Sequence, residues 1–157
     1  MKKLLIAVSA LAALGCASAA SADGVRVGTL SCHEASGWGF IFGSSHAVRC
    51  TYTSADGKYQ DRYSGDIGKF GVDVGYQASA VIVWGVFAPT DRIGPGALSG
   101  HYGGITANAA VGVGLGANAL IGGSDHTIGL QPLSVEGGTG LNVAAGIAGL
   151  TLHHEHM

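Results

Sequence analysis

The chain has few charged, aromatic and proline residues, and the scarcity of basic side chains argues against a nucleic-acid partner. Only 11% of its 157 residues are charged, 7% are aromatic and 3 are proline. Every lysine and arginine lies at or before Arg92, and the last aromatic residue is Tyr102. Proteins that bind nucleic acid or anionic membrane surfaces present clusters of basic side chains. We therefore expect no nucleic-acid partner.

Catalytic motifs that a sequence can reveal are also missing. No G-x-S-x-G nucleophile motif occurs. Gly112, Gly114 and Gly116 superficially resemble a phosphate-binding loop, but they continue a strand period and no helical pattern follows them. Serines precede histidines at 44–46 and 124–126, yet neighbours on a strand face different ways, and catalytic triads are assembled across a fold. We therefore expect a protein that is not an enzyme and that uses no cofactor.

The N-terminal residues have the pattern of an export signal. Two lysines precede an apolar run at 4–14, and small residues follow up to an Ala-x-Ala site that ends at Ala22. This pattern predicts a signal peptide over residues 1–22, including a signal helix, that is cleaved before Asp23. The apolar run is too short to span a bilayer permanently. The expected location is the periplasm or the exterior.

Lipoprotein processing is the alternative interpretation of the same segment. Ala13-Leu14-Gly15-Cys16 resembles a lipobox, in which the cysteine is lipidated and becomes the first mature residue. The usual motif has leucine three positions before the cysteine, where this chain has Ala13. Lipidation of Cys16 would make the protein an outer-membrane lipoprotein.

Cleavage defines a mature chain of one domain. Removal of 22 residues from 157 leaves 135, residues 23–157, enough for one modest core. Six basic and ten acidic residues then remain, a net charge of −4. Cys32 and Cys50 form an even pair in an oxidising compartment, so a disulfide worth roughly 3 kcal/mol is the default. Two free buried thiols, or a reactive cysteine, are the alternatives.

Alternation of apolar and polar residues predicts strands through most of the mature chain. The segment 70–89 is the most hydrophobic: its first half alternates, and residues 80–88 are apolar on both faces, as in a covered strand. Residues 77–79 make these halves either a hairpin or one long bent strand. The other predicted strands cover 25–29, 38–43, 47–53, 59–63, 109–121, 127–135 and 142–152. Asp56-Gly57 predicts a turn, Pro132 a bend or an edge, and 89–100 a long loop. One short helix around 66–70 is also compatible.

These patterns predict a mainly β fold. We expect a single small antiparallel β-barrel or sandwich of about eight to ten strands, rich in glycine. A glycine within a strand costs roughly 0.5–1 kcal/mol relative to alanine, so a row of them indicates close approach by other groups. We hypothesise that the Gly/Ala face around Gly114 lies under rings such as those of Trp38, Phe40, Phe70 or Trp84. The alternative is that these glycines relieve the curvature of a small barrel.

The C-terminal residues His153, His154 and His156 are the nearest approach to a metal site. Imidazoles and the neighbouring Glu155 suit Zn²⁺, Cu²⁺ or Ni²⁺. They follow the last predicted strand, however, at a chain end where order is least expected. We therefore predict a flexible tail over 153–157 whose metal binding is weak or incidental, and no functional metal site.

Several segments together resemble a known bacterial family. They are Gly28–Cys32, Gly37–Ser45, Lys69–Gly75, Leu130–Gly137 and Gly140–Gly146. In this order they resemble the family called domain of unknown function 992. The resemblance implies a small exported protein of Gram-negative bacteria, with Cys32 and Cys50 at the positions of the family's pair. It brings no activity, cofactor or catalytic residue. The strand rhythm alone is also similar to SYLF-like envelope domains, whose basic membrane-binding helix has no counterpart after Arg92.

Three functional classes remain. The leading one is a non-catalytic periplasmic or envelope protein with a structural or binding role, whose unknown partner is an envelope lipid or a protein. The second is a β-domain that binds lipid or a small apolar ligand at the outer membrane. The third is a small transmembrane β-barrel, although residues 80–88 are apolar on both faces and the aromatic residues form no two girdles.

Overall fold

The computed structural model describes residues 24–39, 44–69, 75–104, 119–137 and 147–156. Within these ranges the chain forms strands and no helix, so nothing there is a helix long and apolar enough to cross a membrane. The strands are β1 (Val25–Glu34), β2 (Gly37–Gly39), β3 (Ser44–Ser54), β4 (Gln60–Lys69), β5 (Gly75–Gln77), β6 (Ala80–Ala88), β7 (Gly100–Gly104), β8 (Leu120–Gly122), β9 (Ile128–Glu136) and β10 (Ile147–His154). The predicted signal peptide and its helix, Cys16 and Gly112–Gly116 lie outside the described residues.

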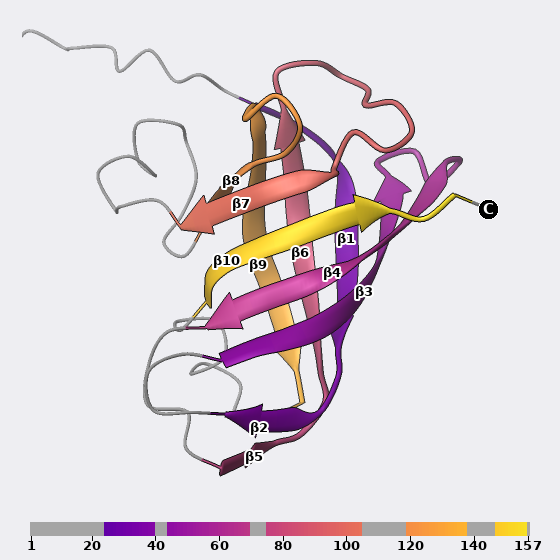
Figure 1. The fold of residues 1–157 in the computed structure, drawn as a ribbon. Helices are drawn as coiled ribbons and strands as arrows, with labels where there is room; N and C mark the ends of the chain where they lie inside the picture. The colour runs from indigo at the N-terminus through magenta and orange to yellow at the C-terminus, as the bar shows by residue number, and fades with distance from the viewer. Residues whose placement is uncertain (1–23, 40–43, 70–74, 105–118, 138–146, 157) are drawn as a thin grey trace, which may run out of the picture.

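Eight of these strands form a closed antiparallel barrel, which confirms the predicted fold class (Figure 1). Their order around the barrel is β1-β3-β4-β10-β7-β8-β9-β6. The last strand, β10, is therefore inserted between β4 and β7, and β6 lies between β1 and β9. The short strands β2 and β5 pair with each other in a separate sheet below one end of the barrel (Figure 1).

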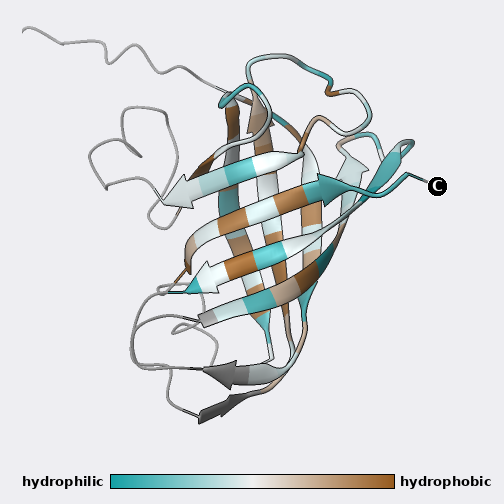
Figure 2. Cartoon of the chain, viewed as in Figure 1, coloured by the Kyte–Doolittle hydropathy of each residue, from teal (hydrophilic) through white to brown (hydrophobic). Residues whose placement is uncertain are grey.

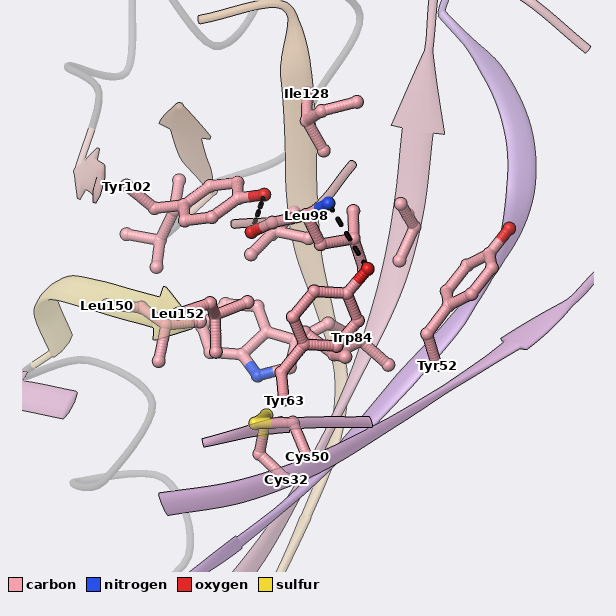
Figure 3. Packing of buried hydrophobic residues seen from close by; sticks show 14 of the residues in the cluster. Cys32, Cys50, Tyr52, Tyr63, Trp84, Leu98, Tyr102, Ile128, Leu150 and Leu152 are labelled. Carbon is pink, nitrogen blue, oxygen red and sulfur yellow. Dashed lines mark hydrogen bonds between the residues drawn. A yellow bond between two sulfur atoms is a disulfide. The ribbon is translucent and has the colours of Figure 1, made fainter. Parts of the chain in front are cut away.

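Inward-facing side chains fill the barrel. Trp84 has no exposed surface, and Tyr52 and Tyr63 are at most 2% exposed. The other large side chains that are fully buried are Leu30, Val48, Ile67, Ile82, Leu98, Leu120, Leu130, Leu150 and Leu152. Figure 3 shows Tyr63, Trp84, Leu98, Leu150 and Leu152 of this core between the strands, with the Cys32–Cys50 disulfide below them. An interior filled in this way is a hydrophobic core, as in other barrels of about eight strands.

The predicted disulfide is present in this core. Cys32 on β1 and Cys50 on β3 lie directly opposite each other in the register of the two strands, and their sulfur atoms are bonded. Both residues are at most 2% exposed. The bond links two strands that already pair, so it holds the register of β1 and β3 against slippage.

Most predicted strands are found with changed bounds, and three local predictions are decided. The helix compatible with 66–70 is wrong for residues 66–69, because β4 continues to Lys69 with partners β3 and β10 on both sides. β5 and β6 do not pair with each other, which excludes the hairpin between them. Pro132 lies at a bulge, where the register between β6 and β9 shifts. The predicted bend is therefore confirmed.

Two glycines show the close approach that the glycine content predicted. A Cβ atom on Gly65 would lie 1.7 Å from the carbonyl oxygen of Thr151, and one on Gly122 would lie 1.8 Å from that of His101. Any side chain at these positions requires a backbone shift. The atoms concerned belong to neighbouring strands, and the hypothesis about rings over Gly114 falls outside the described residues.

Hydrophobic and hydrophilic residues alternate along the strands of the barrel (Figure 2), and the outward-facing residues differ between its two walls. On β6 the outward side chains Val81, Val83 and Phe87 are half-buried, and on β9 Leu133 is 48% exposed. We call these four residues the outer apolar strip. The wall made by β3, β4 and β10 instead exposes charged and imidazole side chains: Arg49, Arg62, Asp66 and His153.

The predicted loop between β6 and β7 covers one end of the barrel. Leu98 of this loop has no exposed surface and enters the core. Its backbone N–H donates to the Tyr63 hydroxyl at 3.4 Å, and its carbonyl accepts from the Tyr102 hydroxyl at 2.9 Å (Figure 3). The two tyrosines thus hold the loop from below, and this loop-capped end lies opposite the end that carries β2 and β5.

Candidate functional site

A hydrogen-bonded network surrounds Asp61 at the loop-capped end. Asp61 Oδ2 accepts from the Tyr63 hydroxyl at 2.7 Å and from the Gly96 backbone N–H at 2.9 Å. Asp61 Oδ1 lies 2.6 Å from Nε2 of His154 and accepts from the Arg62 backbone N–H at 3.1 Å. The network therefore joins β4, β10 and the capping loop, with every carboxylate oxygen partnered.

The contacts of Asp61 keep its carboxyl ionised. Burial alone would raise the pKa of Asp61, but the hydrogen bonds from Gly96, Tyr63 and His154 outweigh burial and hold this pKa below its usual value. Burial raises the pKa of Tyr63, and the neighbouring Asp61 raises it further. Tyr63 therefore remains a neutral hydroxyl that donates to a carboxylate.

Asp61 and His154 form a carboxylate–imidazole dyad, the arrangement that orients the histidine of a catalytic triad. In a catalytic triad the second imidazole nitrogen faces a nucleophile. Here the imidazole ring lies under Gly96, where a Cβ atom would be 3.4 Å from Nδ1 of His154. Its other neighbours are the rings of Tyr63, 5.5 Å away, and His156, 4.7 Å away. Among the described residues, no nucleophile bonds to this ring, and the dyad serves to hold the loop.

A cleft of about 300 Å³ opens on the other side of the same loop. Its apolar lining comes from Ala88, Pro89, Ile93, Ala97 and Ile128, and its polar lining from Thr90, Arg92, Ser124, Asp125 and Thr127. The turn before β9 closes it, with Ser124 Oγ donating to the Ala97 carbonyl at 3.4 Å. In this turn His126 has φ of 54°, in the left-handed region that non-glycine residues rarely adopt. The size is at the lower limit for a small-molecule site.

The three C-terminal histidines are not gathered into one group. The prediction that the tail leaves the last strand before residue 153 is wrong, because β10 runs to His154 and pairs there with Tyr63 of β4. His153 is exposed on the outer face, whereas His154 faces Asp61. No group of three or more potential ligands arranged to hold a metal occurs in the described part of the chain.

The opposite end of the barrel contains a second ionisable cluster, which we call the buried charge cluster: Glu34, His46 and Lys69. Lys69 Nζ lies 2.5 Å from Glu34 Oε1, and His46 Nδ1 lies 3.7 Å from the same oxygen. The exposed fractions of the three residues are only 2%, 4% and 6%. A Cβ atom on Gly37 of β2 would come within 3.0 Å of His46 Nδ1, so the small sheet lies against the cluster.

Polar atoms of this buried charge cluster remain unpartnered. Neither Glu34 Oε2 nor His46 Nε2 has a hydrogen-bond partner, and the third such buried atom among the described residues is Trp84 Nε1. Such groups are uncommon in folded proteins, because each costs about 1–3 kcal/mol of lost hydration. Two of them in one cluster mark it as unusual.

The serine–histidine neighbours in the sequence do not form sites. His46 belongs to the buried charge cluster, and Ser45 next to it is exposed on the opposite face of β3. In the segment 124–126 all three residues are exposed at the turn beside the cleft.

Sequence reasoning missed both ionisable clusters, although part of the signal was visible. Asp61 shares its face with Tyr63, which predicts a common side of a strand. Glu34 continues the inward phase of Leu30 and Cys32, but the predicted first strand stopped at residue 29. The partners are 35 and 93 residues away in the chain, so only the strand order brings them together.

Comparisons with known proteins identify the family. No curated protein and no solved structure matches the chain. The family model of DUF992, described as a protein of unknown function, matches residues 11–153, almost the whole sequence. The chain therefore belongs to the DUF992 family, as its segments had indicated.

Proposed function

We propose that this chain is an exported, non-catalytic protein of the bacterial envelope, with a structural or binding role in the periplasm. The observation that carries the proposal is the Cys32–Cys50 disulfide inside the packed barrel. Disulfides persist in oxidising compartments, and small exported domains use them to supplement a modest core. The signal pattern at residues 1–22 and the family resemblance agree with export.

Binding, in this proposal, takes place on the outside of the barrel. Among the described residues, side chains such as those of Trp84 and Tyr63 fill the space between the strands, so we place the binding surface elsewhere. The cleft beside the capping loop is the concave surface on which we place a small ligand or a partner's side chain. Arg92 and Asp125 line it with opposite charges over apolar residues. The dyad of Asp61 and His154 holds the loop from the other side.

Fractionation of cells that express the full chain tests this proposal. We expect release with the periplasmic fraction without detergent, and a mature N-terminus at Asp23 by mass spectrometry. Recovery of the full-length chain in the cytoplasm with reduced Cys32 and Cys50 would overturn it. A lipidated N-terminus at Cys16 would replace the soluble protein by an outer-membrane lipoprotein.

A second candidate, a domain that binds lipid at the outer membrane, is favoured by the outer apolar strip. Val81, Val83, Phe87 and Leu133 give one wall an apolar outer surface, in contrast to the charged wall opposite. Lipid that co-purifies with the wild type but not with a Phe87→Ser/Leu133→Ser variant would support this candidate. An Arg49→Ser variant on the other wall is the matched control.

The transmembrane alternative is the least compatible with this geometry. Transmembrane barrels have an apolar outer band and a polar interior. In the part of the chain that the structure describes, the middle of the interior is apolar, and Arg49, Arg62 and Asp66 are exposed on the outer surface. Extraction only by detergent is the result that would favour it.

A further inference from the structure

The buried charge cluster holds an amine and a carboxyl group close enough to react with each other. Glu34 is at the end of β1 and Lys69 at the end of β4, on either side of β3. Both side chains point into the barrel, and Lys69 Nζ lies 2.5 Å from Glu34 Oε1. Because both strands are fixed in a closed barrel, an amine and a carboxyl group are held in contact. Such fixation can raise the effective concentration of reacting groups to roughly 10⁵–10⁸ M.

Burial makes the charged form of this pair costly. Charges in a medium of low dielectric lose their hydration, and for a buried ion pair the loss can exceed the attraction between the partners. Transfer of one proton from the ammonium to the carboxylate would give a neutral amine and a neutral acid. The amine is a nucleophile and the acid is an electrophile, whereas the charged forms are neither.

We propose that Lys69 and Glu34 condense to an intramolecular amide, an isopeptide bond between Nζ of Lys69 and Cδ of Glu34. The amine lone pair attacks Cδ, and the tetrahedral intermediate carries Oε1, Oε2 and the new C–N bond. Two protons, one from the acid and one from the nitrogen, leave with Oε2 as one molecule of water. Nothing is oxidised or reduced, and no co-reactant is needed.

Two further observations in the cluster concern the oxygen that leaves and the group that stabilises the charge on the other oxygen. Oε2 of Glu34 has no hydrogen-bond partner, so nothing holds it in the site, and it is the oxygen that leaves. His46 Nδ1 lies 3.7 Å from Oε1, where a proton on the imidazole would stabilise negative charge on that oxygen as the amine adds. The product contains no buried charge, which removes the desolvation cost of the ion pair.

The amide would add a covalent link that the disulfide does not provide. Cys32–Cys50 joins the adjacent strands β1 and β3, whereas the amide joins β1 to β4 across β3. Glu34 is two residues beyond Cys32 on the same inward face. Together the two bonds would hold three strands at this end of the barrel.

Peptide mapping of the full chain, purified in its folded state and then reduced at the disulfide, tests the proposal. Trypsin should produce one branched species of residues 27–49 joined to residues 63–92, because an acylated Lys69 is not cleaved. Its mass should equal that of the two peptides less one water. Recovery of separate, unmodified peptides from folded wild-type protein overturns the proposal.

Three variants locate the reaction. Lys69→Arg keeps the positive charge but lacks the reactive amine, and we expect no loss of water; a loss that persists there overturns the proposal. Lys58→Arg, at the exposed turn between β3 and β4, should retain the branched peptide. His46→Gln should lower the branched fraction, and an unchanged fraction would overturn the role given to His46. The wild-type result stands even where a variant fails to fold, and it does not depend on the proposed function.

Discussion

The two ends of the barrel hold their inward carboxylates in opposite ways. At the loop-capped end Asp61 has partners on both oxygens, and the cluster around it is partly open to solvent, since the side chain of His154 is 18% exposed. At the other end Glu34 contacts Lys69 and His46 inside the protein, and polar atoms of the cluster lack partners. The same type of side chain is satisfied at one end and left incomplete at the other.

This difference separates two uses of a buried carboxylate. A carboxylate that accepts several hydrogen bonds is held as an anion and serves to fix the elements around it, as Asp61 fixes β4, β10 and the loop. A carboxylate that faces an amine without full solvation is costly as an anion and is closer to a reactive state. The contrast can be tested by removing each group in turn.

The largest effect is expected from Glu34→Ala. It leaves the Lys69 amine buried without its partner, whether that partner is held by charge or by the proposed amide, and isolating one member of a buried pair costs about 3–5 kcal/mol. Guanidinium unfolding followed by circular dichroism measures the change. A loss smaller than that of Asp61→Asn would reverse the contrast between the two ends.

Removal of the disulfide comes next. A Cys32→Ala/Cys50→Ala variant should lose about 2–4 kcal/mol, because the unfolded chain regains the freedom that the bond removes. The wild type should approach the stability of this variant when a reductant is added, and the variant itself should not respond. If the reductant destabilises both proteins equally, the effect does not arise from this bond.

A smaller loss is expected from Asp61→Asn at the loop-capped end. The amide keeps the shape of the carboxylate but loses its charge-assisted bonds, which should cost about 1–3 kcal/mol, since water can reach the site. Asp66→Asn, exposed on the same strand, is the matched control and should stay within about 0.5 kcal/mol. Equal losses in the two variants would show that the network around Asp61 is not stabilising.

The smallest effect is a pH dependence at the same residue. Since the pKa of Asp61 is lower in the folded protein than in the unfolded chain, its contribution is fully present above the unfolded pKa of about 3.9. It is lost as the pH falls through the folded pKa. The difference in melting temperature between the wild type and Asp61→Asn should therefore be constant near neutrality and shrink in acid. A difference that grows on acidification would contradict this sign.

The sequence predicted the elements better than their arrangement. The continuous apolar run at 80–88 and the Asp56-Gly57 turn identify a covered strand and a hairpin, because these are local properties. The disulfide followed from the number of cysteines in an expected oxidising compartment. The many short strands and the glycine content also predict a barrel. They do not predict the order in which the strands pair.

The site residues could not be predicted because they depend on that order. Asp61 meets His154 only since β10 lies beside β4, and Glu34 meets Lys69 only since both flank β3. The mistaken helix at 66–69 had the same origin: Asp66-Ile67-Gly68-Lys69 has a weak local preference, which pairing with two neighbouring strands overrides.

Because β10 lies between β4 and β7, the barrel can close only after this strand has been synthesised. Protein synthesis delivers β10 after the other described strands, yet β10 is the strand that joins β4 to β7. Until residues 147–154 emerge, two strand edges remain open to pairing with any other extended chain. A nascent chain that stalls before this point should be a strong client for chaperones and prone to aggregation, whereas one that has released its final strand has both of these edges covered.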